Sequence, residues 1–293
     1  MTMRKKRDST PTRSLMKRLT LAVVVAMVFC IGLVANAHAL PTEPLPPATV
    51  TPEEAKAILM RMGEFMSKLQ SFSVEVRDTY DTYQTTGQKI EYGETRKITM
   101  ARPDRLRIDI EESDGDKQVL TIDSKAITLA SQPANVFAQT ASPGNLDASI
   151  VYFVRDLQMR LPFAVLLISN SPAEMRQRVT KLDYVEKTSL YGAPAHHLAG
   201  RTESVDFQVW ITDGDKPVPQ RLVITYTKEK GQPQFRAQFS NWNLAPEAPA
   251  SLFTFTPPPG AHQISFLAQL PRSAASAVKP VKDSKSKKSG GQK

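Results

Sequence analysis

The histidines and the short motifs of this chain are the first places to look for chemistry. His196 and His197 are adjacent, and neighbouring side chains of an extended strand point to opposite faces, so the two cannot bind one metal ion together. The sequence has no His-Glu-x-x-His motif, no Gly-x-Ser-x-Gly motif and no glycine loop that would cradle a phosphate. We expect one packed and one exposed histidine, and neither a metal site nor a cofactor.

Two Asp-Gly-Asp segments, residues 114–116 and 213–215, have the residue types of a calcium loop. A hairpin turn explains each of them better, because Asp and Gly are residues that tight turns favour. Residues 284–287 match a Ser-x-x-Lys pattern, but they lie in a low-complexity tail that cannot hold a nucleophile in place. No catalytic residue is assigned, and the chain is predicted not to be an enzyme.

The formal net charge of +9 at pH 7 is concentrated at the two ends of the chain. Residues 1–39 carry a net charge of +6 and residues 272–293 carry the same, which leaves −3 for the residues between them. A folded region with this charge offers no basic patch for a phosphate backbone, so we expect no nucleic-acid partner. The basic tail could contact an anionic membrane surface.

The first 39 residues have the three regions of a cleavable secretory signal. A basic stretch (residues 4–18) precedes an uncharged run of 15 residues (21–35), and Ala37 and Ala39 form the small-residue cleavage pattern. A membrane-spanning helix needs about 20 apolar residues, so an uncleaved anchor is the weaker alternative. We place the cleavage after Ala39 and expect the mature protein in the periplasm.

The only cysteine, Cys30, lies inside this apolar run and follows Phe29, where a lipoprotein signal would place a small residue. We therefore expect no lipid anchor. The mature chain then has no cysteine, which excludes disulfides, thiolate metal sites and thiol nucleophiles.

Composition divides the mature chain into three parts. Residues 40–50 contain four prolines and are predicted to form a linker, and residues 272–293 lack large apolar side chains and are predicted to be a disordered basic tail. The region between them, 51–271, has the length of one domain, which we expect to be a monomer.

The domain begins with a segment, 51–69, that has clear helix signals. Thr51 is a predicted N-cap, Pro52 occupies the first helical position and Glu54 completes a capping box. Apolar residues then recur at intervals of three and four and form one stripe. They are Ala55, Ile58, Leu59, Met62, Phe65, Met66 and Leu69.

Segments with alternating apolar and polar residues follow this helix, separated by turn residues, and predict an antiparallel sheet or barrel. An apolar stretch without alternation interrupts them and predicts two short helices, 146–160 and 162–168, before Ser171-Pro172. The alternating apolar positions are Phe72, Val74, Val76, Tyr80, Ile98, Met100, Leu106, Ile108, Ile110, Leu120, Ile122, Val205, Phe207, Val209, Ile211, Leu222, Ile224, Tyr226, Phe235, Ala237 and Phe239.

Several short blocks, in this order, carry a resemblance that spans nearly all of residues 51–267. The chain resembles a family of uncharacterised bacterial periplasmic proteins, a domain of unknown function placed in the LolA/LolB-like lipoprotein-carrier superfamily. The blocks are residues 102–107 (RPDRLR), 196–198 (HHL), 205–211 (VDFQVWI), 217–219 (PVP), 241–242 (NW) and 253–261 (FTFTPPPGA).

The resemblance implies an α+β fold, mainly β, in which a half-open antiparallel β-barrel is covered by helices and can hold acyl chains. It also implies a role for Arg102, because in the carriers an arginine directly before a proline at a strand end helps to hold the helical lid closed. An ion pair at a turn is an equal alternative for Arg102. The predicted ligand-binding residues are Ile58, Leu59, Met62, Phe65, Phe72, Val74, Leu106, Ile108, Phe207 and Val209.

The leading hypothesis is a periplasmic binder or carrier of a lipophilic ligand, such as a lipid or the acyl chains of a lipoprotein. Burying the seven stripe residues would stabilise the fold by on the order of 10 kcal/mol, at roughly 1.5 kcal/mol each. An acyl chain could replace part of that contact. The alternative is a non-catalytic interaction or sensing module of the cell envelope that binds another protein.

Overall fold

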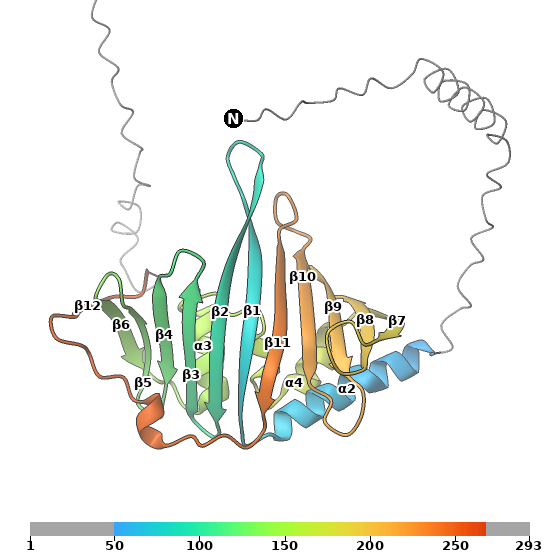
Figure 1. Ribbon diagram of the computed structural model, residues 1–293, viewed down its shortest axis with the longest axis horizontal. Helices are drawn as coiled ribbons and strands as arrows, with labels where there is room; N and C mark the ends of the chain where they lie inside the picture. Colours follow the sequence, from blue (N-terminus) through green and yellow to red (C-terminus); the bar gives the residue numbers. More distant parts are fainter. Residues whose placement is uncertain (1–49, 268–293) are drawn as a thin grey trace, which may run out of the picture. The chain divides into compact units, whose positions relative to one another are not determined.

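Alternating strands build one twelve-stranded sheet in the computed structural model, which describes residues 50–267 (Figure 1). The predicted signal peptide, most of the predicted linker and the predicted tail lie outside the described residues. The strands are β1 (Ser71–Tyr83), β2 (Lys89–Ala101), β3 (Arg105–Glu112), β4 (Lys117–Ile122), β5 (Ala126–Ser131), β6 (Val136–Ala141), β7 (Lys181–Thr188), β8 (Ala195–Arg201), β9 (Val205–Thr212), β10 (Pro219–Tyr226), β11 (Gln234–Asn243) and β12 (His262–Ile264).

The sheet is open, with β12 and β7 at its two ends, in the order β12-β6-β5-β4-β3-β2-β1-β11-β10-β9-β8-β7. Neighbouring strands are antiparallel except β12 and β6, which are parallel. The predicted mainly-β fold with a helix-covered antiparallel sheet is confirmed. The sheet does not close into a barrel, however, because its end strands do not pair with each other.

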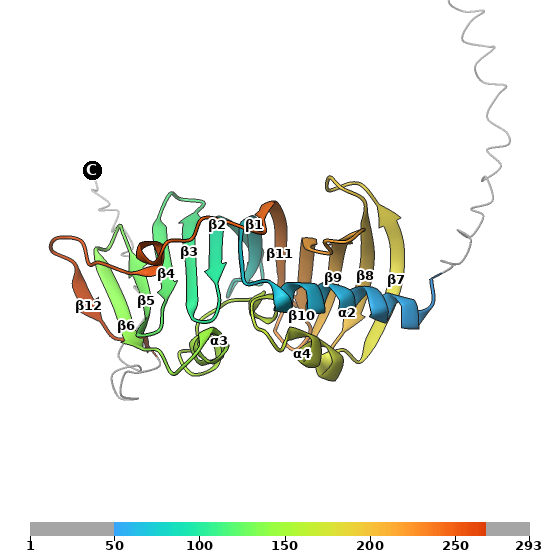
Figure 2. The ribbon, with the colours of Figure 1, turned by 90° about the horizontal axis from the view of Figure 1, so that it is seen from below.

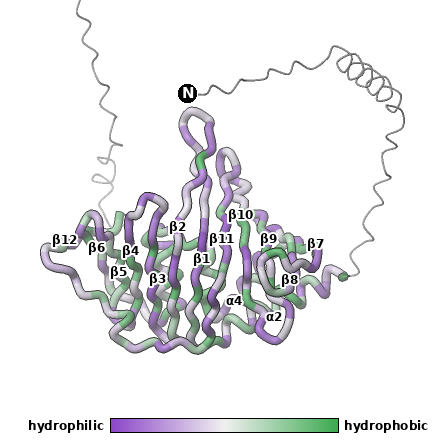
Figure 3. The backbone as a smooth tube through the Cα atoms, in the orientation of Figure 1, coloured by the Kyte–Doolittle hydropathy of each residue, from purple (hydrophilic) through white to green (hydrophobic). Residues whose placement is uncertain are grey.

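Each strand has a helix-facing side and an outer side. Hydrophobic and hydrophilic positions alternate along the strands in Figure 3. In β1, Phe72, Val74 and Val76 are buried on the helix-facing side, whereas Glu75 and Arg77 are exposed on the outer side. This is the period-two pattern of a sheet that is covered on one face.

Three helices and a short 3₁₀ turn cover the helix-facing side: α2 (Pro52–Lys68), α3 (Leu146–Arg155), η1 (Ala164–Leu166) and α4 (Ser171–Arg178). Figure 2 shows them together on one side of the sheet. The predicted first helix is confirmed, including the capping box in which Thr51 and Glu54 bond each other's backbone N–H. We call these four elements and their connections the cover.

The two helices predicted between residues 146 and 168 are partly wrong. α3 ends at Arg155 rather than at 160, and only residues 164–166 of the second segment form a helical turn. Ser171-Pro172 begins α4 instead of closing the helical region, because Pro172 lies near the N-terminus of the helix, where its missing N–H costs nothing. None of the helices within residues 50–267 is long and apolar enough to span a membrane.

After β11 the chain crosses the outer side of the sheet, which Figure 2 shows on the side away from the helices. This segment, 244–264, contains η2 (Ala250–Phe253) and ends in β12; we call it the strap. Arg107 Nη1 donates a hydrogen bond to the Leu252 carbonyl at 3.1 Å, and Phe255 packs on Phe137 with 5.2 Å between ring centroids. The strap therefore buries outer-side residues of β3 and β6 that would otherwise face solvent.

Candidate functional site

The ten predicted ligand-binding residues lie together in one hydrophobic cluster between the cover and the sheet. Phe65 and Phe207 are partly buried, and the other eight are buried. Side chains of α2 and of the sheet are thus in contact where a ligand cavity was predicted. Their role in ligand binding stays a prediction.

Phe207 is held in this cluster by a glycine on the neighbouring strand. Gly200 of β8 is directly opposite Phe207 of β9, and a Cβ atom at Gly200 would come within 2.2 Å of the Phe207 ring. The ring therefore lies over the backbone of Gly200, and any side chain at this position would displace it.

Arg102 lies at the end of β2 and binds three parts of the cover. Its Nε donates to the Leu69 carbonyl at the end of α2 (3.2 Å), and its Nη2 donates to the Leu167 carbonyl after η1 (2.9 Å). Its Nη1 pairs with Asp147 at the start of α3, at 3.1 Å. The guanidinium thus connects the sheet to α2, α3 and the η1 segment at a single point.

Asp147 extends this connection. Its second carboxylate oxygen accepts hydrogen bonds from the backbone N–H (2.9 Å) and the hydroxyl of Ser169. Arg102 forms an ion pair with Asp147, and it also donates to two carbonyls of the cover, which a simple ion pair at a turn would not include. The assignment of Arg102 as a lid clasp stays a prediction, and its position suits that role.

A buried charged cluster lies on the helix-facing side of β1 and β2. Arg96 Nε is 3.1 Å from Asp78, whose side chain is fully buried, and Arg96 also pairs with Glu94. The Arg96 guanidinium lies over the Phe163 ring of the cover, 5.6 Å from its centroid. Burial raises the pKa of Asp78 to about 7, with Arg96 opposing the shift and Glu94 adding to it.

Sequence reasoning did not assign this cluster, although a signal was present. Asp78 occupies the apolar register of β1, between Val76 and Tyr80, where a core residue is expected. A charged residue at a core position needs a partner. Arg96 of β2, which is on the same face of the sheet, was the partner that the sequence offered.

The two histidines lie on opposite faces of β8, as expected. His197 is buried and stacks on Trp210, with 3.9 Å between ring centroids. His196 bonds Tyr184 and Asp213, and only 14% of its side chain is exposed. The expectation of one exposed histidine is therefore wrong, because Tyr184 and Asp213 cover it.

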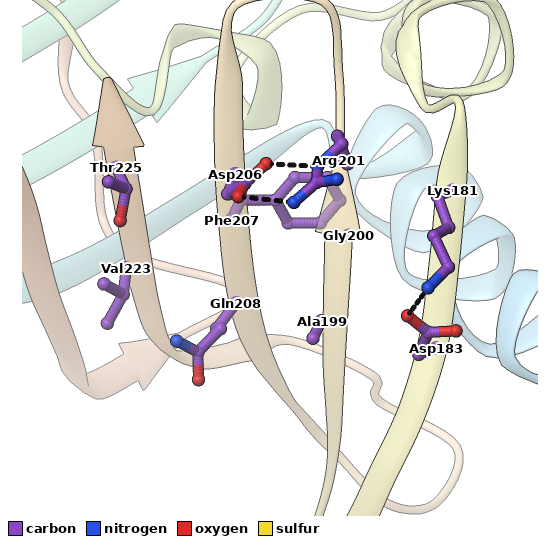
Figure 4. Close-up of a pocket in the computed structure, with 10 residues that line it drawn as sticks. All are labelled: Lys181, Asp183, Ala199, Gly200, Arg201, Asp206, Phe207, Gln208, Val223 and Thr225. Carbon is purple, nitrogen blue, oxygen red and sulfur yellow. Dashed lines mark hydrogen bonds and ion pairs between the residues drawn. The ribbon is translucent and has the colours of Figure 1, made fainter. Parts of the chain in front are cut away.

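Two depressions lie on the outer side of the sheet. One, of about 240 Å³, is bounded by the ion pairs Arg201–Asp206 and Lys181–Asp183 (Figure 4). The other, of about 590 Å³, spans β1 to β4 and is lined mainly by charged and amide side chains. Both differ in chemistry from the apolar site predicted from the sequence.

Comparison with solved structures finds proteins of low sequence identity. A lipoprotein of Mycobacterium tuberculosis, LppX, is 14% identical over 67% of this chain and 99% of its own, with a TM-score of 0.43. MucB of Pseudomonas aeruginosa, in its complex with MucA, is 18% identical over 69% of this chain and 61% of its own, with a TM-score of 0.37. A LolA superfamily protein of Nitrosomonas europaea is 12% identical over 69% of this chain and 97% of its own, with a TM-score of 0.34.

No curated protein matches the chain. One family model does, over residues 55–267, and it is described as "Predicted periplasmic protein (DUF2092)". The match confirms the resemblance to an uncharacterised periplasmic family that the short sequence blocks indicated.

Proposed function

The chain belongs to the DUF2092 family of predicted periplasmic proteins, and from this premise we propose that it binds and carries a lipophilic ligand beneath its cover. The ligand would be a lipid or the acyl chains of a lipoprotein. No catalytic step is part of the proposal.

The observation that carries the proposal is the way in which Arg102 holds the cover. One guanidinium at the β2–β3 turn binds the end of α2, the start of α3 and the η1 segment. Bonds gathered at one side chain can hold the cover closed and can be broken together when it opens. Such a clasp suits a lid over a binding site.

The contact beneath the cover is apolar, which favours exchange with a lipid. Leu59 and Met62 of α2 are almost fully buried in the same cluster as Phe72 and Leu106 of the sheet. The hydrophobic effect is non-directional, so an acyl chain can replace these contacts at little net cost. A ligand that binds the open state of the cover more tightly than the closed state then supplies the free energy for opening.

A second function, a non-catalytic module that binds another envelope protein, is favoured by the packing itself. The residues predicted to line a cavity are in contact with one another, as in an ordinary core. In that case, partners would bind at surfaces such as the charged depression on β1–β4.

Native mass spectrometry of the protein purified from the periplasm, followed by organic extraction, tests the proposal. We expect a bound lipid, and uptake of a fluorescent fatty acid by the delipidated chain. If the purified protein carries no lipid and takes up no fatty acid, the carrier function is overturned and binding of an envelope protein is the function that remains.

A further inference from the structure

One row of side chains crosses the outer side of the sheet from β7 to β1. Each member is directly opposite the next one on the neighbouring strand, so all six lie on the same face. We call them the outer row, and the apolar cluster beneath the cover lies on the other side of the sheet. In the order of the strands they are Glu186, His197, Trp210, Arg221, Gln238 and Arg77.

Arg221, in the middle of the outer row, is held by aromatic rings and not by a carboxylate. Its guanidinium carbon lies 5.2 Å from the centroid of the Tyr191 ring and 5.6 Å from that of the Trp210 ring. Trp210 also stacks on His197, and Tyr191 packs edge-on against Trp210. Cation–π contacts fix the position of a guanidinium without neutralising its charge.

Buried polar atoms without a partner gather at the same place. Within residues 50–267 they are Nδ1 of His197, Oε1 of Gln220 and Nε of Arg221. Arg221 forms no hydrogen bond or ion pair in this part of the chain, and its Nη1 and Nη2 reach the surface. A partly buried charge without a counter-charge is unfavourable. A carboxylate from another molecule would therefore stabilise this arginine.

The outer row ends in a second arginine that lacks a partner. Arg77 is exposed, forms no hydrogen bond or ion pair within the described residues, and lines the depression of about 590 Å³ on β1–β4. Only Gln238 lies between it and Arg221, so the two arginines are two strands, or about 10 Å, apart. Residues 40–271 carry a net charge of −3, so this pair is not part of a generally basic surface.

The surface around Arg221 offers room and an apolar contact. The depression of about 240 Å³ in Figure 4 is lined by Gln208 and Val223, which are the next positions of β9 and β10 on the same face. Leu190, beside Tyr191 in the β7–β8 loop, is 75% exposed, more than any other large apolar residue within residues 50–267.

This combination favours a protein over a lipid surface as the occupant. Tryptophan, tyrosine and arginine are the residue types most often found where protein–protein contacts are strongest. A bilayer attracts mobile lysine side chains by charge alone, whereas a guanidinium fixed by two rings suits a carboxylate at one defined position.

We propose that the outer row binds an acidic segment of another envelope protein, with carboxylates of that segment on Arg221 and Arg77 and an apolar side chain on Leu190. The inference goes beyond the proposed function, because it uses the opposite side of the sheet. It holds whether or not a lipid binds beneath the cover.

Two labelled nonapeptides with blocked ends test the charge: EEGELEGEE and its neutral counterpart QQGQLQGQQ. Their binding to the full chain is measured by fluorescence anisotropy. Because the basic C-terminal segment also attracts the acidic peptide, the comparison is between the wild type and the double variant Arg77→Gln/Arg221→Gln. We expect the wild type to bind the acidic peptide roughly three- to tenfold more tightly, the range of two exposed ion pairs. The neutral peptide should bind both proteins equally.

Two further variants locate the site. Arg61→Gln removes an exposed arginine of α2, on the other side of the sheet, and should bind both peptides as the wild type does. Leu190→Ser should weaken both peptides and leave the melting temperature unchanged, because this side chain is mostly exposed. If Arg221→Gln lowers the melting temperature, Arg77→Gln carries the test alone, since Arg77 is exposed and unpaired within residues 50–267.

Equal affinity of the acidic peptide for the wild type and the double variant would overturn the proposal. A double variant that binds the peptide normally but adsorbs less to phosphatidylglycerol vesicles would show that the outer row contacts a membrane. Self-association of the wild type that the double variant abolishes would show that the occupant is a second copy of the chain. Either result also overturns the proposal. Fatty-acid uptake should be equal in all these proteins, so the carrier function is tested separately.

Discussion

Asp78 and Asp81 are three positions apart in β1 and lie on opposite faces of the sheet, and they show how one strand can hold carboxylates whose pKa values shift in opposite directions. Burial raises the pKa of Asp78. At Asp81 burial is outweighed by hydrogen bonds from Arg236 and from the backbone N–H of Gln234, so its pKa is lowered. The two residues should therefore affect stability with opposite dependence on pH.

The first prediction concerns Asp78→Asn. Because the folded-state pKa of about 7 is above the ordinary value of 3.8, the folded chain holds this proton more tightly, and its stability falls as pH rises between those values. An asparagine has no such proton to lose, so the free energy of unfolding of the variant should fall less between pH 5 and pH 8 than that of the wild type, by about 1–2 kcal/mol. Urea unfolding at both pH values measures it.

Asp81→Asn is the control on the same strand. Folding lowers the pKa of the Asp81 carboxylate, so this group stabilises the wild type at every pH above the pKa that it has in the unfolded chain. The stabilisation is lost only as pH falls below that value, so Asp81→Asn should be less stable than the wild type at both pH 5 and pH 8. An unchanged pH dependence in Asp78→Asn would show that Asp78 stays ionised in the folded chain.

The second prediction concerns Arg102→Leu, which removes the three bonds to the cover. We expect a bound fluorescent fatty acid to be released several-fold faster, with a stability loss of about 1–3 kcal/mol from the partners left unbonded. Stopped-flow transfer to vesicles measures the release. Arg107→Leu, which breaks the strap contact on the outer side instead, should leave the release rate unchanged.

Helices and strands differ in how well the sequence predicts them. The capping box and apolar stripe predicted α2 to within one residue, and the alternating segments predicted the positions of β1 to β4 and β9 to β11. β5 to β7 and the three-residue β12 were not assigned, because their alternation is short or mixed with polar residues, and of β8 only His196 and His197 were placed on a strand. The site was less predictable, since the Arg102 contacts depend on how the cover packs on the sheet, and the Asp78–Arg96 pair depends on which strands become neighbours.

The third prediction concerns α2 as a movable element. Leu59→Asp places a charge in the contact with the sheet, where it lacks a partner. If α2 is a lid, the helix can turn outwards into solvent. The variant should then lose much of its fatty-acid uptake, whereas its melting temperature should change little. Ala57→Asp, on the exposed face of the same helix, should change neither. If Leu59→Asp no longer unfolds cooperatively and the wild type takes up no fatty acid, α2 is part of a fixed core.

At the scale of the whole molecule, the fourth prediction concerns residues 272–293, which lie outside the described residues. Because this segment carries a net charge of +6 and lacks large apolar side chains, deleting it should leave the melting temperature unchanged. The same deletion should weaken salt-sensitive adsorption to anionic vesicles. A fall of many degrees in the melting temperature would mean that the tail packs on the domain.

The pairing of β1 with β11 has a consequence for the order of folding. β1 to β6 form one meander and β7 to β11 another, and in the described sheet β1–β11 is their only strand pairing. The Gln234 N–H donates to Asp81, 153 positions away in the sequence. Long-range pairing of this kind is slow compared with hairpin formation, so pulsed hydrogen exchange should protect both meanders before the β1–β11 amides. Because a chain is synthesised from its N-terminus, the edge of β1 then stays unpaired until β11 has been made, and that interval is when the protein is most prone to aggregate.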